Sequence, residues 1–221
     1  MARDAARGVG RALGRERARI PTAWESAALM FGPRIVGDNG IELRPPTLED
    51  YKLFTDWQMR PEVTRFWGPR FTTDTVATAE ERLKRHLESN DSVSWSIAYG
   101  GETVGFTGIF DISWTDRDGE TGIFIGRHDL YGKGIASEAV RLRMAFIWNE
   151  LGLHRTHNWI ALANEGSWRA NQKSGYSQIG TYPRSWFRSG EWFDEWLGEA
   201  FPNTFPAGKL PSPWRDEGHP K

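Results

Sequence analysis

Two glycines separated by one residue, Gly132–Lys133–Gly134, stand where an apolar run gives way to an amphipathic segment. The run covers residues 121–126 and the segment continues from Ile135 to about Leu151, which predicts a strand, a turn and a helix. The first amides of a helix lack intrahelical partners and lie at the positive end of the helix dipole. Because glycine leaves such amides unobstructed, this loop is typical of a site for a phosphorylated cofactor.

The loop alone leaves several interpretations open. A dinucleotide fingerprint requires a third glycine, but Ser137 stands there, and the next expected strand ends in Ala163–Asn164. A nucleotide P-loop requires Gly-Lys-Ser or Gly-Lys-Thr, which this loop does not contain. An ordinary helix-start turn in an α/β protein is the third interpretation.

Residues 164–176 add a second motif, Asn-Glu-Gly-Ser-Trp-Arg-Ala-Asn-Gln-Lys-Ser-Gly-Tyr. It resembles the second cofactor motif of the GNAT superfamily of N-acetyltransferases, in which Asn and a Ser or Ala open a helix that ends in Lys-x-Gly-aromatic. The glycine loop resembles the pyrophosphate loop of the same family, at the expected distance upstream. The resemblance extends from about Ile41 to Ala200. Four short stretches resemble the branch that contains the ribosomal-protein-alanine N-acetyltransferases: Phe31–Arg34, Ile41–Pro45, Gly119–Gly122 and Gly190–Asp194.

This resemblance implies a cytoplasmic enzyme that moves acetyl from acetyl-CoA directly to a primary amine, without an acyl-enzyme. The acceptor would be a protein N-terminus or a small molecule such as an antibiotic or a polyamine. The alternative is a degenerate module that binds acyl-CoA as a sensor or scaffold. The implied fold is of the α+β (mixed α/β) class, with a mostly antiparallel central sheet flanked by helices.

The resemblance also assigns cofactor binding to the strand end, the glycine loop and the following motif. The residues concerned are Phe124, Ile125, Gly126, Tyr131, Gly132, Lys133, Gly134, Ile135, Ala136, Asn164, Ser167 and Asn171. The amides of residues 131–136 would surround the pyrophosphate. Asp129 stands where the family usually carries Arg or Gln, so any contact there must be made by backbone or be displaced.

Direct acetyl transfer requires that the amine lose a proton and that the leaving thiolate gain one. Glu120, at the start of the cofactor strand, is the expected base, through a water; a surface carboxylate is the equally weighted alternative. Asn171 stands where many family members place a tyrosine acid. An amide cannot donate a proton as an acid, although it can hydrogen-bond a thiolate. Otherwise a water, Ser167 or a tyrosine from elsewhere (Tyr131 or Tyr182) would supply the proton.

Acceptor binding is assigned to aromatic and acidic residues, Trp67, Trp186 and Asp194, because aromatic faces and carboxylates suit a cationic amine. Core packing is the alternative for the aromatic residues. His154 and His157 lie three residues apart with no third ligand, so no metal site is expected. His86 is expected to be a solvated surface residue.

Composition excludes several classes of protein. The 221 residues contain no cysteine, which excludes disulfides, thiolate metal sites and a Cys nucleophile. A formal net charge of −1 argues against DNA binding by bulk electrostatics. No apolar run is long enough for a transmembrane helix. Monomer and homodimer both remain open.

Three regions are expected: a basic N-terminal extension (1–30), one domain (31–201) and a Pro/Gly-rich C-terminal tail (202–221). Arginines recur every four residues in the extension, at positions 3, 7, 11, 15 and 19, which suits an arm for an anionic surface or a poorly ordered tail. Within the domain, hydrophobic periodicity predicts helices at 47–59, 75–88, 135–151 and 167–174. Strands are expected at 41–44, 92–99, 103–114, 120–126, 156–162, 176–188 and 191–200.

Overall fold

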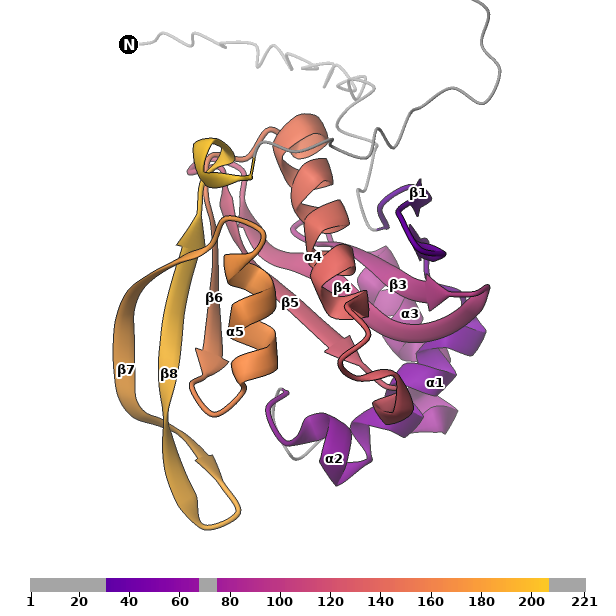
Figure 1. Ribbon diagram of the computed structural model, residues 1–221. Helices are drawn as coiled ribbons and strands as arrows, with labels where there is room; N and C mark the ends of the chain where they lie inside the picture. Colours follow the sequence, from indigo (N-terminus) through magenta and orange to yellow (C-terminus); the bar gives the residue numbers. More distant parts are fainter. Residues whose placement is uncertain (1–30, 68–74, 207–221) are drawn as a thin grey trace, which may run out of the picture.

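The computed structural model describes residues 31–67 and 75–206, which form an eight-stranded sheet with helices on both faces (Figure 1). The strand order is β1-β2-β3-β4-β5-β6-β8-β7, and every pairing is antiparallel except that of β5 with β6. The strands are β1 (Ile35–Val36), β2 (Ile41–Arg44), β3 (Val93–Tyr99), β4 (Glu102–Ser113), β5 (Asp118–Ile125), β6 (Thr156–Ala161), β7 (Ser177–Arg188) and β8 (Glu191–Ala200). The predicted α+β fold with a mostly antiparallel sheet is confirmed.

The helices divide between the two faces of this sheet. In Figure 1, α4 (Ile135–Phe146) and α5 (Glu165–Gln172) cover the near face, while α1 (Leu48–Gln58) and α3 (Ala79–Leu87) lie behind it. The short α2 (Pro61–Thr64) follows α1. Each expected helix is present, but the segment predicted at 135–151 is α-helical only to Phe146 and continues as one π-helical turn, Ile147–Leu151. Neither α2 nor β1 was expected, because both are too short to show a periodic pattern.

Two apolar cores hold these layers together. One lies between α4 and the sheet, where Trp95, Leu142 and Trp196 are almost fully buried. The other lies beneath α1 and α3 and is aromatic, with Phe54 packed edge-on against both Phe106 and Phe124. Alternate residues of a strand point to opposite faces, so β4 and β5 contribute side chains to both cores. Packing on both faces holds these two strands in place.

Of the three regions expected from the sequence, the structure describes most of the central domain and the beginning of the C-terminal tail. The N-terminal extension and most of the C-terminal tail lie outside the described residues. The beginning of the tail, the turn Pro202–Thr204, packs against Gly175, where an added Cβ would lie 2.4 Å from the Thr204 carbonyl oxygen. Among the helices of residues 31–67 and 75–206, none is long and apolar enough to cross a membrane.

The first helix is joined to the sheet by the buried carboxylate of Asp50. Asp50 forms a capping box with Thr47 and accepts two hydrogen bonds from Arg44 of β2, at 2.7 and 2.9 Å. Ser96 of β3 donates to the same carboxylate at 2.9 Å, and Thr103 of β4 also donates to it. These donors outweigh the opposing effect of burial and lower the pKa of Asp50 to about 2.

Replacing Asp50 with Asn should therefore destabilise the protein in a pH-dependent way. A lowered pKa means that the carboxylate stabilises the fold above its unfolded pKa near 3.8, and that this contribution is lost as the pH falls towards about 2. We expect Asp50→Asn to lower the free energy of unfolding by about 2 kcal/mol at pH 7. Urea unfolding from pH 7 down to pH 2.5 should show the difference shrinking below pH 4. Asp56→Asn, on the exposed side of the same helix, is the control, and an equal pH-dependent loss there would contradict the assignment.

Candidate active site

The site lies where β5 and β6 separate. The two parallel strands share a single registered pair, Glu120 with His157, and then diverge, as Figure 1 shows. Two cavities of about 610 and 600 Å³ open around this gap. We call them the acidic cavity and the loop cavity, after the residues described below. They meet at a shared lining of Phe66, Trp67, Ile123, Asn164 and Ser167.

The glycine loop borders the loop cavity, as the sequence predicts. Gly132 and Gly134 have φ angles of +78° and +81°, in the left-handed region that favours glycine, and an added Cβ at either would point into open space. Gly134 is the N-cap of α4, whose first residues, Ile135 and Ala136, also line the cavity. Free helix amides, two bare glycines and an adjoining cavity are the features that an anionic pyrophosphate requires.

Three residues expected to hold the cofactor lie differently from the expectation. The Tyr131 amide already donates to His128 O at 3.1 Å, so it is not available to a phosphate; its hydroxyl donates to Ile125 O and its side chain lines the cavity. Lys133 is exposed and lies outside the lining of both cavities. Gly126 lies against Trp57, whose ring is 2.0 Å from where a Cβ would stand, so packing alone requires glycine there.

The acidic residue beside the loop is neutralised. Asp129 accepts hydrogen bonds from Arg127 Nε at 2.8 Å and from Arg127 Nη2 at 2.7 Å. This bidentate pair outweighs the opposing effect of desolvation and lowers the pKa of Asp129 to about 2. The carboxylate therefore stays charged, but its charge is balanced by the guanidinium, which reduces its repulsion of a phosphate group.

The second motif brings Asn164, Ser167 and Asn171 to the gap. Asn164 caps α5, and both it and Ser167 line the two cavities where these meet. Phe124 and Ile125, on β5, line the loop cavity across from them. Asn171 lines the acidic cavity but is only 2 % exposed. Its Oδ1 accepts from Asn158 Nδ2 at 2.9 Å and its Nδ2 donates to Ser167 O at 2.9 Å, so its amide is held at both ends.

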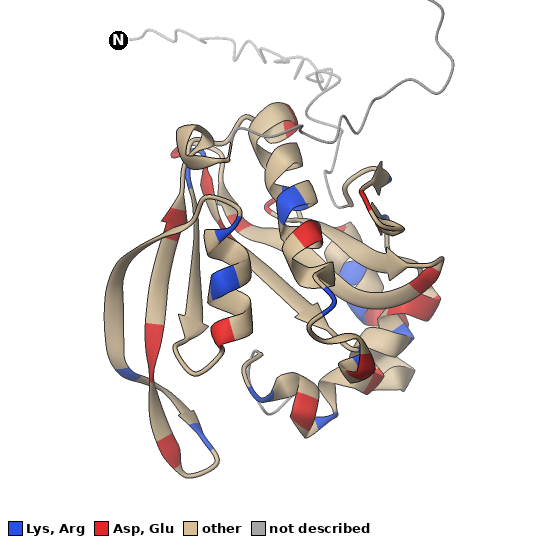
Figure 2. Cartoon of the chain, viewed as in Figure 1, with Lys and Arg blue, Asp and Glu red and all other residues tan. Residues whose placement is uncertain are grey.

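The acidic cavity contains three carboxylates: Glu120 of β5, Asp111 of β4 and Glu195 of β8. Glu195 is 7 % exposed and, among the described residues, forms neither a hydrogen bond nor an ion pair. Burial raises the pKa of Glu120, and the charges of Asp111 and Glu195 raise it further. Figure 2 shows acidic positions recurring along β8 with no basic position between them. Such a cavity attracts a cation.

Of the three residues expected to bind the acceptor, two line the acidic cavity and one does not. Trp67 and Trp186 both line it, and the edge of the Trp67 ring lies 3.0 Å from where a Cβ on Gly122 would stand. Asp194 is outside the lining: its Oδ1 accepts from Arg184 N at 2.8 Å. Its neighbour Glu195 points the other way, into the cavity, because successive strand residues face opposite sides.

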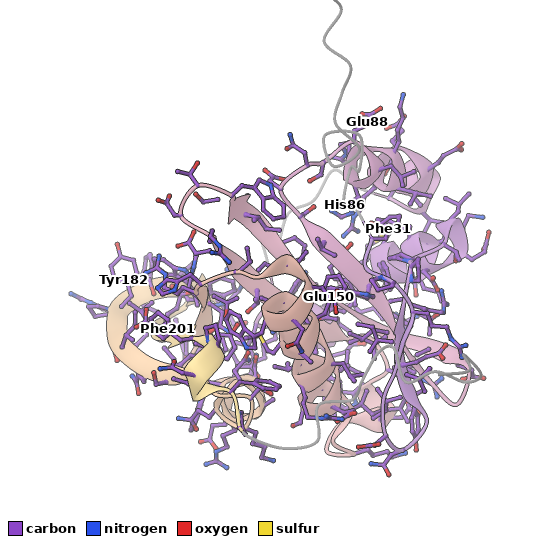
Figure 3. The ribbon with its side chains drawn as sticks, turned by 90° about the horizontal axis from the view of Figure 1, so that it is seen from above. Phe31, His86, Glu88, Glu150, Tyr182 and Phe201 are labelled. Carbon is purple, nitrogen blue, oxygen red and sulfur yellow. The ribbon has the colours of Figure 1, made fainter. Side chains whose placement is uncertain are left out.

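His86 is not the solvated residue that was expected. Figure 3 shows it on the side of α3 that faces the sheet, while Glu88 points away. The ring is half-buried, its Nδ1 is hydrogen-bonded to Tyr51 OH, and it stacks on Phe106 at a centroid distance of 6.4 Å. The sequence around His86 does not predict this burial, because lysine and arginine precede the histidine and a leucine follows it.

Sequence reasoning did not single out Glu195 or Arg143 for the site, and considered Thr121 and Tyr176 only as parts of motifs. Arg143 of α4 lines the acidic cavity from beneath and is fully buried. The signal for Arg143 was its place among apolar residues of an amphipathic helix, where a charged side chain is unusual. Nothing in the sequence separates Glu195 from the other acidic residues of β8.

Comparison with known proteins places this site in context. The acetyltransferase (GNAT) domain profile matches residues 41–177. The spermidine N(1)-acetyltransferase of Escherichia coli K12 is 22 % identical over 154 residues, covering 70 % of this chain and 82 % of that protein.

Two solved structures share the fold. The spermidine N-acetyltransferase of Vibrio cholerae in complex with CoA and spermine superposes with a TM-score of 0.69 at 16 % identity, covering 76 % of this chain and 98 % of that one. RimJ of Mycobacterium smegmatis in complex with CoA-disulfide superposes with a TM-score of 0.67 at 19 % identity, covering 79 % and 88 % of the two chains.

A charge placed in the glycine loop should abolish binding of CoA. We expect Gly134→Asp to raise the Kd for acetyl-CoA at least about 30-fold, since the carboxylate would repel the pyrophosphate at the helix N-terminus. Gly134→Asn is the matched control, because Asn has the same shape and tolerates the left-handed backbone without the charge. Titration calorimetry of both variants measures the difference. Equal affinities for Asp and Asn would place the pyrophosphate elsewhere.

Proposed function

The chain belongs to the GNAT family of acetyltransferases and is an N-acetyltransferase, and from this premise we propose that it transfers acetyl from acetyl-CoA to a small, positively charged amine. The donor would lie with its pyrophosphate at the glycine loop and its thioester in the gap between β5 and β6. Asn164 and Ser167 line both cavities, so donor and acceptor would meet beside them.

The acceptor class rests on one observation, the nearly buried carboxylate of Glu195. A buried charge is costly unless it is paired, and the described residues provide Glu195 with no partner. A cationic amine would supply that partner, and the aromatic faces of Trp67 and Trp186 would contribute cation–π attraction. A spermidine acetyltransferase among the relatives agrees with a polyamine-like acceptor. A peptide N-terminus is the other candidate and carries only one charge at the reacting amine.

Glu120 is suited to the role of base. An ammonium group must lose its proton before it can attack, and a carboxylate with a raised pKa accepts that proton more readily than an ordinary one. Burial and the two neighbouring carboxylates provide the raised pKa. The position of Glu120 at the last registered pair of β5 and β6 places it at the entrance to the gap.

A panel of acceptors tests this function. Purified protein and acetyl-CoA are mixed with diamines, polyamines, aminoglycosides and short peptides, and release of free thiol is followed. We expect turnover with multiply charged small amines, and a loss of kcat/KM of roughly 10- to 100-fold for these acceptors in Glu195→Gln. Glu191→Gln, at the exposed end of the same strand, is the control. Turnover with peptides alone would contradict the acceptor class, and tight acetyl-CoA binding without any turnover would favour a sensor or scaffold.

Replacing the base should remove turnover and leave the fold intact. We expect Glu120→Gln to lower kcat by roughly 10²–10⁴-fold with the Kd for acetyl-CoA little changed. In the wild type, kcat/KM should rise with pH through a value above the ordinary Glu pKa. Because a raised carboxylate pKa makes the fold less stable once the pH exceeds it, the variant should unfold at an equal or higher temperature at pH 7. A loss of kcat smaller than about threefold would exclude Glu120 as the base.

A further inference from the structure

The proposed function leaves the source of the second proton unexplained. The leaving thiolate needs a proton, and Asn171, held by Asn158 and by Ser167, cannot supply one. The Ser167 hydroxyl forms no hydrogen bond with a described residue that would replenish its proton. Thr121 differs in this respect, because the residue lines the acidic cavity and its hydroxyl has a second hydroxyl directly behind it.

We propose that Thr121 protonates the leaving thiolate and is reprotonated by Tyr176, in a relay that rests on the proposed acetyl transfer. Thr121 Oγ1 lies 2.7 Å from Tyr176 OH, and both residues are at most 5 % exposed. Thr156 Oγ1 donates to Tyr176 OH at 2.9 Å, so the tyrosine proton has two acceptors, Thr121 Oγ1 at 2.7 Å and Met144 Sδ at 3.5 Å. The oxygen is the nearer and the stronger acceptor of the two. When Tyr176 donates to Thr121 Oγ1, the Thr121 hydroxyl is able to donate its own proton to a ligand atom in the cavity.

The strand places this donor opposite the base. Glu120 and Thr121 are consecutive residues of β5, so their side chains project to opposite faces of the sheet. Ile123, on the same face as Thr121, packs against the core beneath α4, and Phe124 belongs to the core beneath α1. A thioester in the gap would therefore have the base on one side and the hydroxyl relay on the other.

Arg143 supplies the charge that makes the relay feasible. Its Nη1 donates to Thr107 Oγ1 at 2.7 Å and to Gly122 O at 2.9 Å, but within the described part of the chain its Nε has no acceptor and no carboxylate pairs with it. A fully buried guanidinium without a counter-charge favours a negative charge nearby. Burial lowers the pKa of Arg143, and the nearby Tyr176 hydroxyl opposes that shift.

The C–S bond of the tetrahedral intermediate breaks and its electron pair stays on sulfur. The Thr121 proton passes to that sulfur, and the Tyr176 proton passes to Thr121 Oγ1. Tyr176 is left as a phenolate beside Arg143 and regains a proton from water that enters as the thiol leaves. The proton lost by the amine to Glu120 returns to solvent, so the net reaction is thioester plus amine to amide plus thiol.

Variants of Thr121 test the relay. Thr121→Val has the same shape without the hydroxyl, and we expect it to lower kcat by roughly 10- to 1,000-fold while the Kd for acetyl-CoA changes less than threefold. Thr121→Ser, which keeps the hydroxyl, should recover most of that loss. If Val and Ser are equally slow, or if Val keeps kcat within threefold of the wild type, the relay is excluded.

Tyr176→Phe provides a second, independent test. It should lower kcat to a similar extent, and the double variant with Thr121→Val should be no slower than the slower single variant, because the two hydroxyls act as one unit. Multiplied losses in the double variant would exclude the relay. A wild-type protein without turnover on any amine would instead overturn the proposed function, and the relay with it.

Discussion

The loss of pairing between β5 and β6 beyond Glu120 and His157 determines the rest of the site. A strand that loses its neighbour exposes unpaired backbone groups, and these must be satisfied by something other than the sheet. The protein closes the start of the gap with side chains, since Tyr176 OH contacts Thr121 on β5 and Thr156 on β6. The remainder of the gap stays open as the meeting point of two cavities. An extended ligand with amide groups is suited to fill it.

Charge is distributed around this gap in a way that costs stability. The charge of Glu195 opposes the ionisation of Glu120, and Arg143 is buried without a carboxylate partner among the described residues. A protein optimised for stability alone would pair these groups or replace them with apolar residues. The opposite arrangement is used at Asp129 and Asp50, where each carboxylate is paired with an arginine. Unpaired charge is therefore concentrated where reacting groups would lie.

The sequence allowed most of the fold to be predicted, because long strands and helices carry clear hydrophobic periods. The glycine loop and the helix at 167–174 were likewise found from their motifs. Side-chain direction was harder: Asp194 and Glu195 are equivalent in composition, and only the register of β8 with β6, Glu195 opposite Ala161, turns the second into the cavity. The Tyr131 amide differs from the expectation for a local reason, since a 3₁₀ turn, His128–Leu130, takes it up. Such details depend on backbone geometry that no residue pattern specifies.

The substitution at position 171 illustrates why a motif should be interpreted together with its surroundings. Taken alone, an asparagine in place of an acid indicates a weakened catalyst. In the structure Asn171 ties α5 to β6 through Asn158, and this holds the helix against the wall of the gap. With the amide serving that purpose, a proton donor would have to stand elsewhere, and Thr121 on β5 offers a hydroxyl with a proton source behind it. In this proposal the donor and the base are on the same strand, so the pleat of β5 sets the distance between them. A movement of α5 would then change that distance less than if the donor were on the helix.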